Sequence, residues 1–440
     1  MPIINKNYFL KLWGVLLIVV ITNANLHAQF LMDMVDTTKE TGKGIYNVFR
    51  KFDHLRIGGY IQPQFQIADS NGIKSYEGGD FAAQVSNRFM LRRSRIRLDY
   101  AYFGNQNQPG VQIVFQFDSN ERGFTVRDVW GRIFENKWQL FSFTTGMFAR
   151  PFGHETNLSS SDRESPERGR MNQILMKSER DLGVMLSFDP RNNHPFLKYL
   201  KADIGVFNGQ GINATGDFDN SKDLIARIAL KPLILPNKSK ISAGFSYLHG
   251  GLFQNTRFKN HTILVDGVWK MKTDSSINNV GTDAPRHYYG ADIQYKIPSK
   301  NGITEFRLEF IKGTQTGTAN SSETPTTLLT GNDGFYVRNF SGAYFYYVQP
   351  LFSDKHQLVL KLDYYDPNTK VKANDINSTN GFTAADIKYT TLGLGYINHI
   401  NENVKLTCYY AWVWNEKTQL ANYQNNLSDN VFTLRCQFRF

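Results

Sequence analysis

The sequence predicts an all-β fold, a transmembrane antiparallel β-barrel of about 16 strands. Segments with one apolar face recur from residue 54 to the last residue, Phe440. The connections between these segments alternate between short and long, as they do in barrels that cross a membrane. After the N-terminus the sequence has no uninterrupted apolar run of about 18 residues, so membrane-spanning helices are excluded there.

Residues 1–28 are typical of a secretory signal peptide. Lys6 and Lys11 precede the apolar run LWGVLLIVVI, and Ala28 provides a small residue at the expected cleavage site. The apolar run is short for a membrane helix, although a retained membrane anchor is the alternative. Residues 29–53 are then expected to form a short periplasmic N-terminal segment, and residues 54–440 the barrel.

The stretch RRSRIRLDY shows the alternation clearly. As a strand, it places Arg93, Arg95 and Arg97 on one face and its apolar side chains on the other. In a soluble sheet the apolar face would cover a core, whereas in a membrane barrel it would contact lipid and the arginines would line a wet lumen. The same alternation occurs in residues 54–67, 110–118, 181–188 and 357–364.

The connections favour the membrane barrel. Mostly long connections are expected outside the membrane at residues 68–87, 119–123, 149–179, 209–221, 249–285, 314–334, 367–385 and 416–428. The other connections are short and are expected to be periplasmic, together with both termini. Residues 260–270 look strand-like, but they are assigned to the fifth external loop because a spanning strand there would break the alternation. Pro63 is unexpected in the first strand, since proline removes a donor from the strand ladder.

The last ten residues, VFTLRCQFRF, form a predicted strand that is amphipathic to its end. A terminal strand that closes a barrel against the first strand must be intact. Phe438 and Phe440 lie on its apolar face, and the C-terminal phenylalanine resembles the terminal aromatic residue that barrel-assembly machinery reads in bacterial outer-membrane proteins. These two residues are the predicted barrel-assembly signal, which places the protein in a Gram-negative outer membrane in contact with its lipid.

Composition and motifs exclude several other classes of protein. Cys408 and Cys436 are too few for a disulfide scaffold; they are expected nearly opposite each other in the last hairpin, where apolar packing is favoured over a disulfide. The strings GFSYL and HETNL each lack the last residue of a catalytic motif, so no enzyme activity, metal or cofactor is predicted. The chain has 50 Lys and Arg against 39 Asp and Glu, but no nucleic-acid-binding motif.

Basic residues gather on the predicted lumen face. They are Arg93, Arg95, Arg97, Lys361, Lys405, Arg435 and Arg439. In a water-filled pore such residues raise the local concentration of anions and repel cations. We therefore predict a passive diffusion channel that prefers small anions, with these residues as its anion-binding lining. Two alternatives remain open: a structural or surface-binding barrel that does not conduct, and a sugar-specific channel. The latter would need aromatic side chains along the lumen, whereas most of those placed so far face lipid.

Three strings, FMLRRSRIRLDYAYFGN, GMFARPFGHETNLSSSDRESPERGR and ERDLGVMLSF, resemble in order and spacing the phosphate-selective porin O and P family. The motifs lie between about residues 88 and 190, and the resemblance in layout covers most of residues 54–440. It implies a homotrimer of barrels of about 16 strands, an arginine-lined lumen, an inward-folded third loop, and passage of phosphate, polyphosphate or other anions.

The third external loop, residues 149–179, is long enough to fold into the lumen and is the predicted constriction. Its basic residues, counted to the start of the next strand, are Arg150, Arg163, Arg168, Arg170, Lys177 and Arg180. Between Arg150 and Asp181 these six basic residues are matched by six acidic ones. The resemblance implies an excess of positive charge here, and this chain departs from it. The sequence thus favours a preference for anions over selectivity for phosphate.

Overall fold

The computed structural model of the protein describes residues 54–104, 108–192, 194–214 and 216–440. The predicted signal peptide (1–28) and periplasmic segment (29–53) lie outside the described residues. Among the described residues, no helix is long and apolar enough to cross a membrane.

The described residues form eighteen strands, one α-helix and four 3₁₀ turns. The strands are β1 (Leu55–Ala68), β2 (Asn87–Phe103), β3 (Pro109–Asn120), β4 (Gly123–Phe134), β5 (Phe141–Ala149), β6 (Arg180–Phe188), β7 (Leu200–Phe207), β8 (Asp223–Ile234), β9 (Lys240–Phe253), β10 (Lys259–Val265), β11 (Val268–Asp274), β12 (Asp283–Ser299), β13 (Gly302–Gly317), β14 (Phe335–Pro350), β15 (His356–Asp366), β16 (Tyr389–His399), β17 (Val404–Asn415) and β18 (Val431–Arg439). The helix is α2 (Arg170–Leu175), and the 3₁₀ turns are Leu197–Tyr199, Ile277–Asn279, Ala373–Asp375 and Ala384–Asp386.

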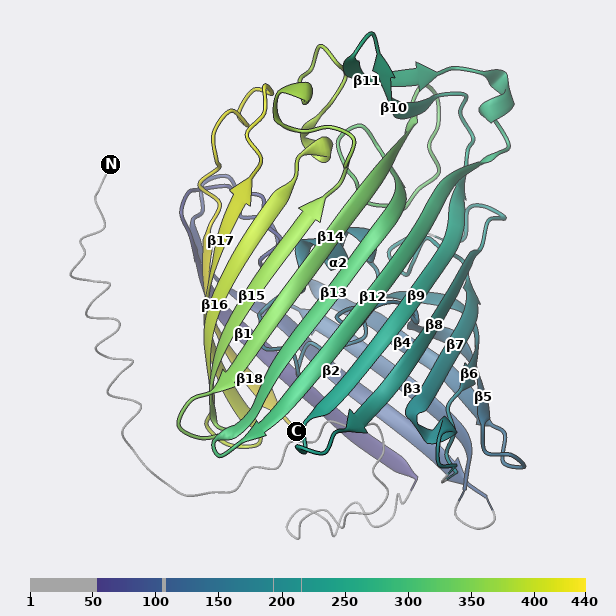
Figure 1. Cartoon of the computed structure of the whole chain (residues 1–440), viewed down its shortest axis with the longest axis vertical. Coiled ribbons are helices and arrows are strands. Elements are labelled where there is room, and N and C mark those ends of the chain that lie inside the picture. Colours follow the sequence, from purple (N-terminus) through teal and green to yellow (C-terminus); the bar gives the residue numbers. More distant parts are fainter. Residues whose placement is uncertain (1–53, 105–107, 193, 215) are drawn as a thin grey trace, which may run out of the picture. The chain divides into compact units, whose positions relative to one another are not determined.

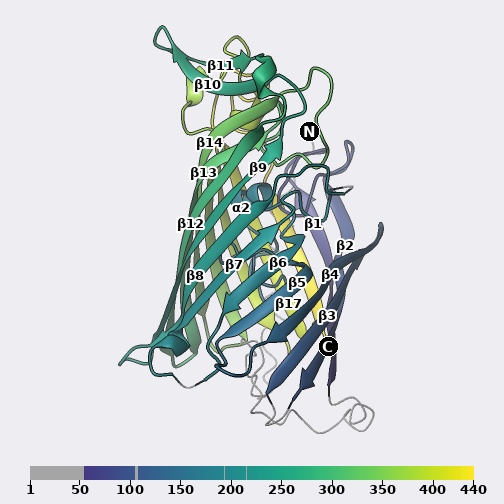
Figure 2. The same cartoon turned by 90° about the vertical axis from the view of Figure 1, so that its right-hand side faces the viewer.

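Sixteen of these strands form a closed antiparallel barrel (Figures 1 and 2). Each pairs with its neighbours along the chain, β12 follows β9 in the wall, and the last strand, β18, pairs with β1. Gly59 and Phe440 exchange two backbone hydrogen bonds, with N–O distances of 3.1 and 3.0 Å, which join the first strand to the last residue. The predicted fold class, a closed barrel of about 16 strands, is confirmed.

Residues 260–270 belong to a hairpin outside the barrel wall. They lie in β10 and β11, which pair with each other in the connection between β9 and β12 (Figure 1). Only the first residues of β10 reach the wall, where 259–261 pair in parallel with 335–337 of β14. The assignment of this strand-like segment to the fifth of the predicted long loops, rather than to a wall strand, is therefore correct, and the alternation of connections holds.

Pro63 sits at a β-bulge between β1 and β2. Gln62 lies opposite Arg93 and Pro63 opposite Leu91, so Arg92 is an extra residue in β2. A bulge leaves one position out of the ladder, which is where a residue without an N–H is tolerated. The bulge also changes the alternation of β2, and both Arg92 and Arg93 hydrogen-bond to a residue of the connection between β5 and β6.

The outward side chains of the barrel are apolar. Ile57, Ile96, Leu182 and Phe245 are 46–52% exposed although each is large and apolar, whereas inward residues such as Arg95 are buried. An apolar outer wall around a polar inner face suits a lipid bilayer, and closed barrels of this kind occur in outer membranes. The barrel is therefore an outer-membrane protein.

An apolar cluster also lies inside the barrel. Tyr288, Tyr344, Tyr346 and Tyr365 are at most 2% exposed and belong to a cluster that includes Met171 of α2. The expectation that most aromatic residues face lipid is wrong for these strands. Because α2 presents apolar side chains to this part of the wall, the strands opposite it carry aromatic residues where alternation alone would place polar ones.

The two cysteines of the last hairpin are free. Cys408 lies opposite Leu434 and Cys436 opposite Leu406, so the cysteines are offset by two residues. Diagonal positions on neighbouring strands are about 7–8 Å apart, which is beyond the usual reach of a disulfide. The prediction of unlinked cysteines is confirmed, whereas their predicted near-opposition is wrong by two residues of register.

Candidate functional site

The connection between β5 and β6, residues 150–179, is referred to below as loop 3. It contacts inward-facing side chains on separate parts of the barrel wall. Ser160 hydrogen-bonds to Tyr60 of β1 at 2.6 Å, and Glu164 accepts two hydrogen bonds of 2.6 Å from Arg307 of β13. Helix α2, which is part of loop 3, is seen within the ring of strands in Figures 1 and 2.

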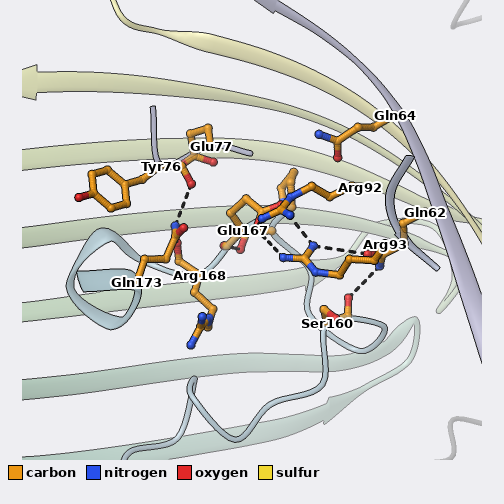
Figure 3. A network of polar contacts seen from close by, with 12 residues as sticks. Gln62, Gln64, Tyr76, Glu77, Arg92, Arg93, Ser160, Glu167, Arg168 and Gln173 are labelled. Carbon is orange, nitrogen blue, oxygen red and sulfur yellow. Dashed lines mark hydrogen bonds and ion pairs between the residues drawn. The ribbon is translucent and has the colours of Figure 1, made fainter. Parts of the chain in front are cut away.

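The carboxylate of Glu167 in loop 3 binds three arginines of the wall. Arg92 donates to its two oxygens at 2.8 and 3.0 Å, and Arg93 at 3.3 and 2.7 Å (Figure 3). Arg435 donates to Oε1 at 2.8 Å. The Glu167 side chain is only 2% exposed. These four residues, referred to below as the arginine cluster, place three positive charges around one negative charge.

The other predicted lining residues lie on the inner face or at its rim, and each has a polar partner. The ion pairs are Arg95–Asp118 (2.9 Å), Arg97–Asp99 (2.7 Å), Lys361–Glu155 (2.9 Å) and Arg439–Asp162 (2.8 Å). Lys405 instead donates to the carbonyl oxygens of Ser161 and Arg163 at 2.6 and 3.2 Å. The structure therefore brings Arg93 and Arg435 together and spreads the remaining lining residues along the wall.

The basic residues predicted for the constriction also have local partners. These are Ser178 and Asp223 for Arg150, Glu179 for Arg168, Glu323 for Lys177, and Asp128 and Glu179 for Arg180. The guanidinium carbon of Arg170 lies 4.7 Å from the ring centroid of Tyr76 and 3.6 Å from that of Tyr389. Arg163 is buried, and its Nε has no hydrogen-bond partner among the described residues. Much of the positive charge of loop 3 is thus balanced nearby.

Several inward arginines were not predicted from the sequence, among them Arg92 and Arg307, which both bind loop 3 carboxylates. Arg92 is displaced to the inner face by the bulge, and Pro63 was the only signal of that bulge in the sequence. Arg307 lies on the same face of β13 as the buried Glu305 and Glu309, so simple alternation would have found it.

No protein-family model and no curated protein matches the sequence. Solved structures do match. OprB of Pseudomonas putida has a TM-score of 0.55 and 9% sequence identity, over 88% of this chain and 94% of that chain. DcaP, an outer membrane channel of Acinetobacter baumannii, has a TM-score of 0.50 and 10% identity, over 88% of this chain and 97% of that chain. The chain has the fold of bacterial outer-membrane porins. Porins are channels rather than enzymes.

Within this porin fold, Glu155 of loop 3 is held as a charged carboxylate. Burial would raise the pKa of Glu155, but Lys361 and Arg163 beside it lower that pKa to about 2. The backbone N–H of Gly169 and the side chain of Asn172 each donate to it at 2.8 Å. The Glu155–Lys361 pair therefore stays neutral as a unit near neutral pH and adds no net charge to the interior.

Glu77, in the connection between β1 and β2, is expected to make ion preference depend on pH. Burial raises the pKa of Glu77 to about 7, although Lys361 opposes this shift; Glu167 and Asp363 raise it further and Arg170 lowers it. A carboxyl with a raised pKa contributes stability that is present below its unfolded pKa and is lost as pH rises through about 7. The same ionisation adds one negative charge beside the arginine cluster.

We therefore expect any anion preference to fall between about pH 6 and about pH 8. The measurement is the reversal potential of the open channel in a KCl gradient at both pH values. Glu77→Gln should reduce the fall, because the amide cannot ionise. An equal pH dependence in the wild type and in this variant would contradict the role of Glu77.

Proposed function

We propose that the protein is a porin through which small anions diffuse passively across the outer membrane. The observation that carries this proposal is the arginine cluster, where three guanidinium groups meet one carboxylate inside the barrel. Excess positive charge in a narrow passage with protein walls attracts anions and repels cations. The buried ammonium of Lys405, which binds carbonyl oxygens, adds to this excess.

Loop 3 is the proposed constriction of the channel. The proposal also concerns which anions pass through it. The resemblance to the phosphate-selective porin O and P family supports phosphate or polyphosphate. The equal numbers of basic and acidic residues between Arg150 and Asp181 support a general preference for anions instead. The proposed function is therefore a general anion channel in which phosphate competes with chloride.

The same resemblance supports a homotrimer. Phe438 and Phe440 are 44% and 65% exposed as residues, so they are accessible to lipid and to the barrel-assembly machinery that the C-terminal phenylalanine suggests as a partner. Chemical cross-linking of the detergent-solubilised protein tests the assembly: a species of three subunits supports it, and a single subunit at all concentrations contradicts it.

A second candidate is a barrel that does not conduct. The apolar cluster around α2 and the buried ion pairs of loop 3 occupy space inside the wall, which favours this reading. A sugar-specific channel has the inward tyrosines that it needs, but Tyr344 and Tyr346 are at most 2% exposed. Their rings are covered by protein and offer no surface to a passing sugar.

The deciding experiment is the current carried by single molecules of the purified protein in a planar bilayer under a KCl gradient. A reversal potential of the sign expected for chloride supports the anion channel, and a reduction of the chloride current by added phosphate supports phosphate as a solute. Absence of current, from protein whose mobility in gels changes on heating as that of folded barrels does, contradicts the channel and supports the second candidate.

A further inference from the structure

The arginine cluster has the contacts of a site for a free oxyanion. Five N–H groups of three guanidiniums donate to the two oxygens of Glu167 at 2.7–3.3 Å. Donors arranged in such forks are how arginine binds carboxylates and phosphates. Arg92 and Arg93 come from β2, and Glu167 comes from loop 3 (Figure 3). Arg435 comes from β18. The wall thus supplies the site, and the loop supplies its occupant.

We infer that Glu167 is a tethered counter-ion that determines anion specificity, because it competes with solute oxyanions of the carboxylate or phosphate class for this site. The inference rests on the proposed function and deepens it, since it assigns the class of solute and the residue that limits its binding. It also gives a reason for the acidic residues of loop 3: at least one of them, Glu167, neutralises arginines of the wall.

Glu167 is the counter-ion on which the three arginines depend. Within the described residues, Arg92, Arg93 and Arg435 form ion pairs with no other carboxylate. Arg93 and Arg435 also donate to neutral side chains, those of Gln62 at 3.5 Å and Gln64 at 2.8 Å. Loss of the negative charge would leave three clustered positive charges, two of them buried, without a carboxylate counter-ion, and a solute anion can then supply the missing charge.

The backbone around Glu167 is held by contacts that do not use its carboxylate. Arg435 Nη1 donates to the carbonyl oxygen of Pro166 at 2.6 Å. Lys361 Nζ and Ser165 Oγ donate to the carbonyl oxygen of Glu167 at 3.3 and 2.5 Å. A substitution that removes only the charge therefore keeps the loop in place, and a change in anion binding can be assigned to the charge.

The test variant is E167Q and the matched control is E164Q. Both replace a loop 3 carboxylate by an amide of the same size. Glu164 pairs with Arg307, which keeps Glu305 as a second partner at 2.6 Å. E164Q thus leaves its guanidinium paired, whereas E167Q leaves the guanidiniums of the arginine cluster without a carboxylate.

Binding of inorganic phosphate to the full-length protein folded in detergent is measured by calorimetry. We expect E167Q to bind phosphate at least about tenfold more tightly than the wild type, because a competing charge in contact with the site is gone. E164Q should bind phosphate as the wild type does, and adding R93Q to E167Q should reverse the gain. Equal affinities of the wild type, E164Q and E167Q would overturn the inference.

The reversal potential of the same proteins separates this inference from the proposed function. A wild type without anion preference, combined with tighter phosphate binding by E167Q, refutes the proposed function and supports the inference. A wild type that prefers anions, with no difference between E164Q and E167Q in phosphate binding, supports the proposed function and refutes the inference. If E167Q does not fold, R92Q replaces it: Arg92 is the most exposed of the three, at 26%, and its loss should weaken phosphate binding. Unchanged binding in R92Q would overturn the inference.

Discussion

Substituting Gly59 with alanine is expected to prevent much of the protein from folding into the closed barrel. A Cβ atom at Gly59 would lie 2.3 Å from the backbone oxygen of Arg95 and 2.7 Å from the Phe440 ring. Backbone cannot move away from the first contact without breaking the pairing of β1 with β2. Overpacking of this kind costs about 1–3 kcal/mol of folding free energy and sometimes more, and here it falls on the contact that closes the wall.

The matched control is the same substitution at the neighbouring residue. A Cβ at Gly58 would meet its nearest neighbour, the Phe440 carbonyl oxygen, at 3.6 Å, which is ordinary van der Waals contact. Unheated gel mobility after refolding into detergent reports the folded fraction. Gly58→Ala should match the wild type, and Gly59→Ala should yield less of the folded form. Equal yields would show that the crowding at Gly59 is relieved by small shifts.

Replacing Arg93, Arg95 and Arg97 together by glutamine is expected to abolish or reverse the anion preference of the open channel. These residues pair with Glu167, Asp118 and Asp99, so their neutralisation removes three positive charges from the inner face while the three carboxylates stay. Because a narrow lumen with protein walls concentrates the field of its charges, three charges suffice to change the sign of selectivity. The reversal potential in a KCl gradient should move toward that of potassium.

Three basic residues outside the barrel wall provide the control for net charge. Arg257, Lys270 and Lys272 are exposed in the connection between β9 and β12. Their joint replacement by glutamine changes the net charge by the same amount without altering the inner face. The reversal potential should stay at the wild-type value in this control. If both triple variants behave alike, the arginines of β2 act as braces of the wall and do not select ions.

The barrel could be predicted because the sequence features that indicate it lie within short stretches of the chain. Alternation along each strand and the lengths of the connections are properties of short stretches, and together they gave the strand count and the place of the hairpin at 260–270. The arginine cluster could not be predicted in this way. It joins Glu167 to Arg435 across 268 positions of sequence, and alternation along single strands does not report which loop residue reaches which strand.

Strict alternation also failed at two identifiable places. It put Arg92 on the lipid side, because it could not account for a bulge that shifts the alternation of β2 by one residue. Pro63 was a signal of this bulge, but the extra residue lies on the partner strand, which the sequence around Pro63 does not identify. It expected polar inner faces on all strands, but Tyr288 and Tyr344 face the apolar side of α2. A helix inside the barrel, such as α2, allows apolar and aromatic side chains on the inner face of the strands that it contacts.

The hydrogen bonds between Gly59 and Phe440 also determine at which stage of folding the barrel can close. They join residues from opposite ends of the described chain, so the wall cannot be completed before Phe440 is available to pair. Contacts so distant in sequence form late, because the entropy of closing the chain is lost before they contribute. Until then β1 and β18 are free edges, which pair readily with other chains. The unclosed wall is therefore most prone to wrong pairing at these two edges, until β18 has paired with β1.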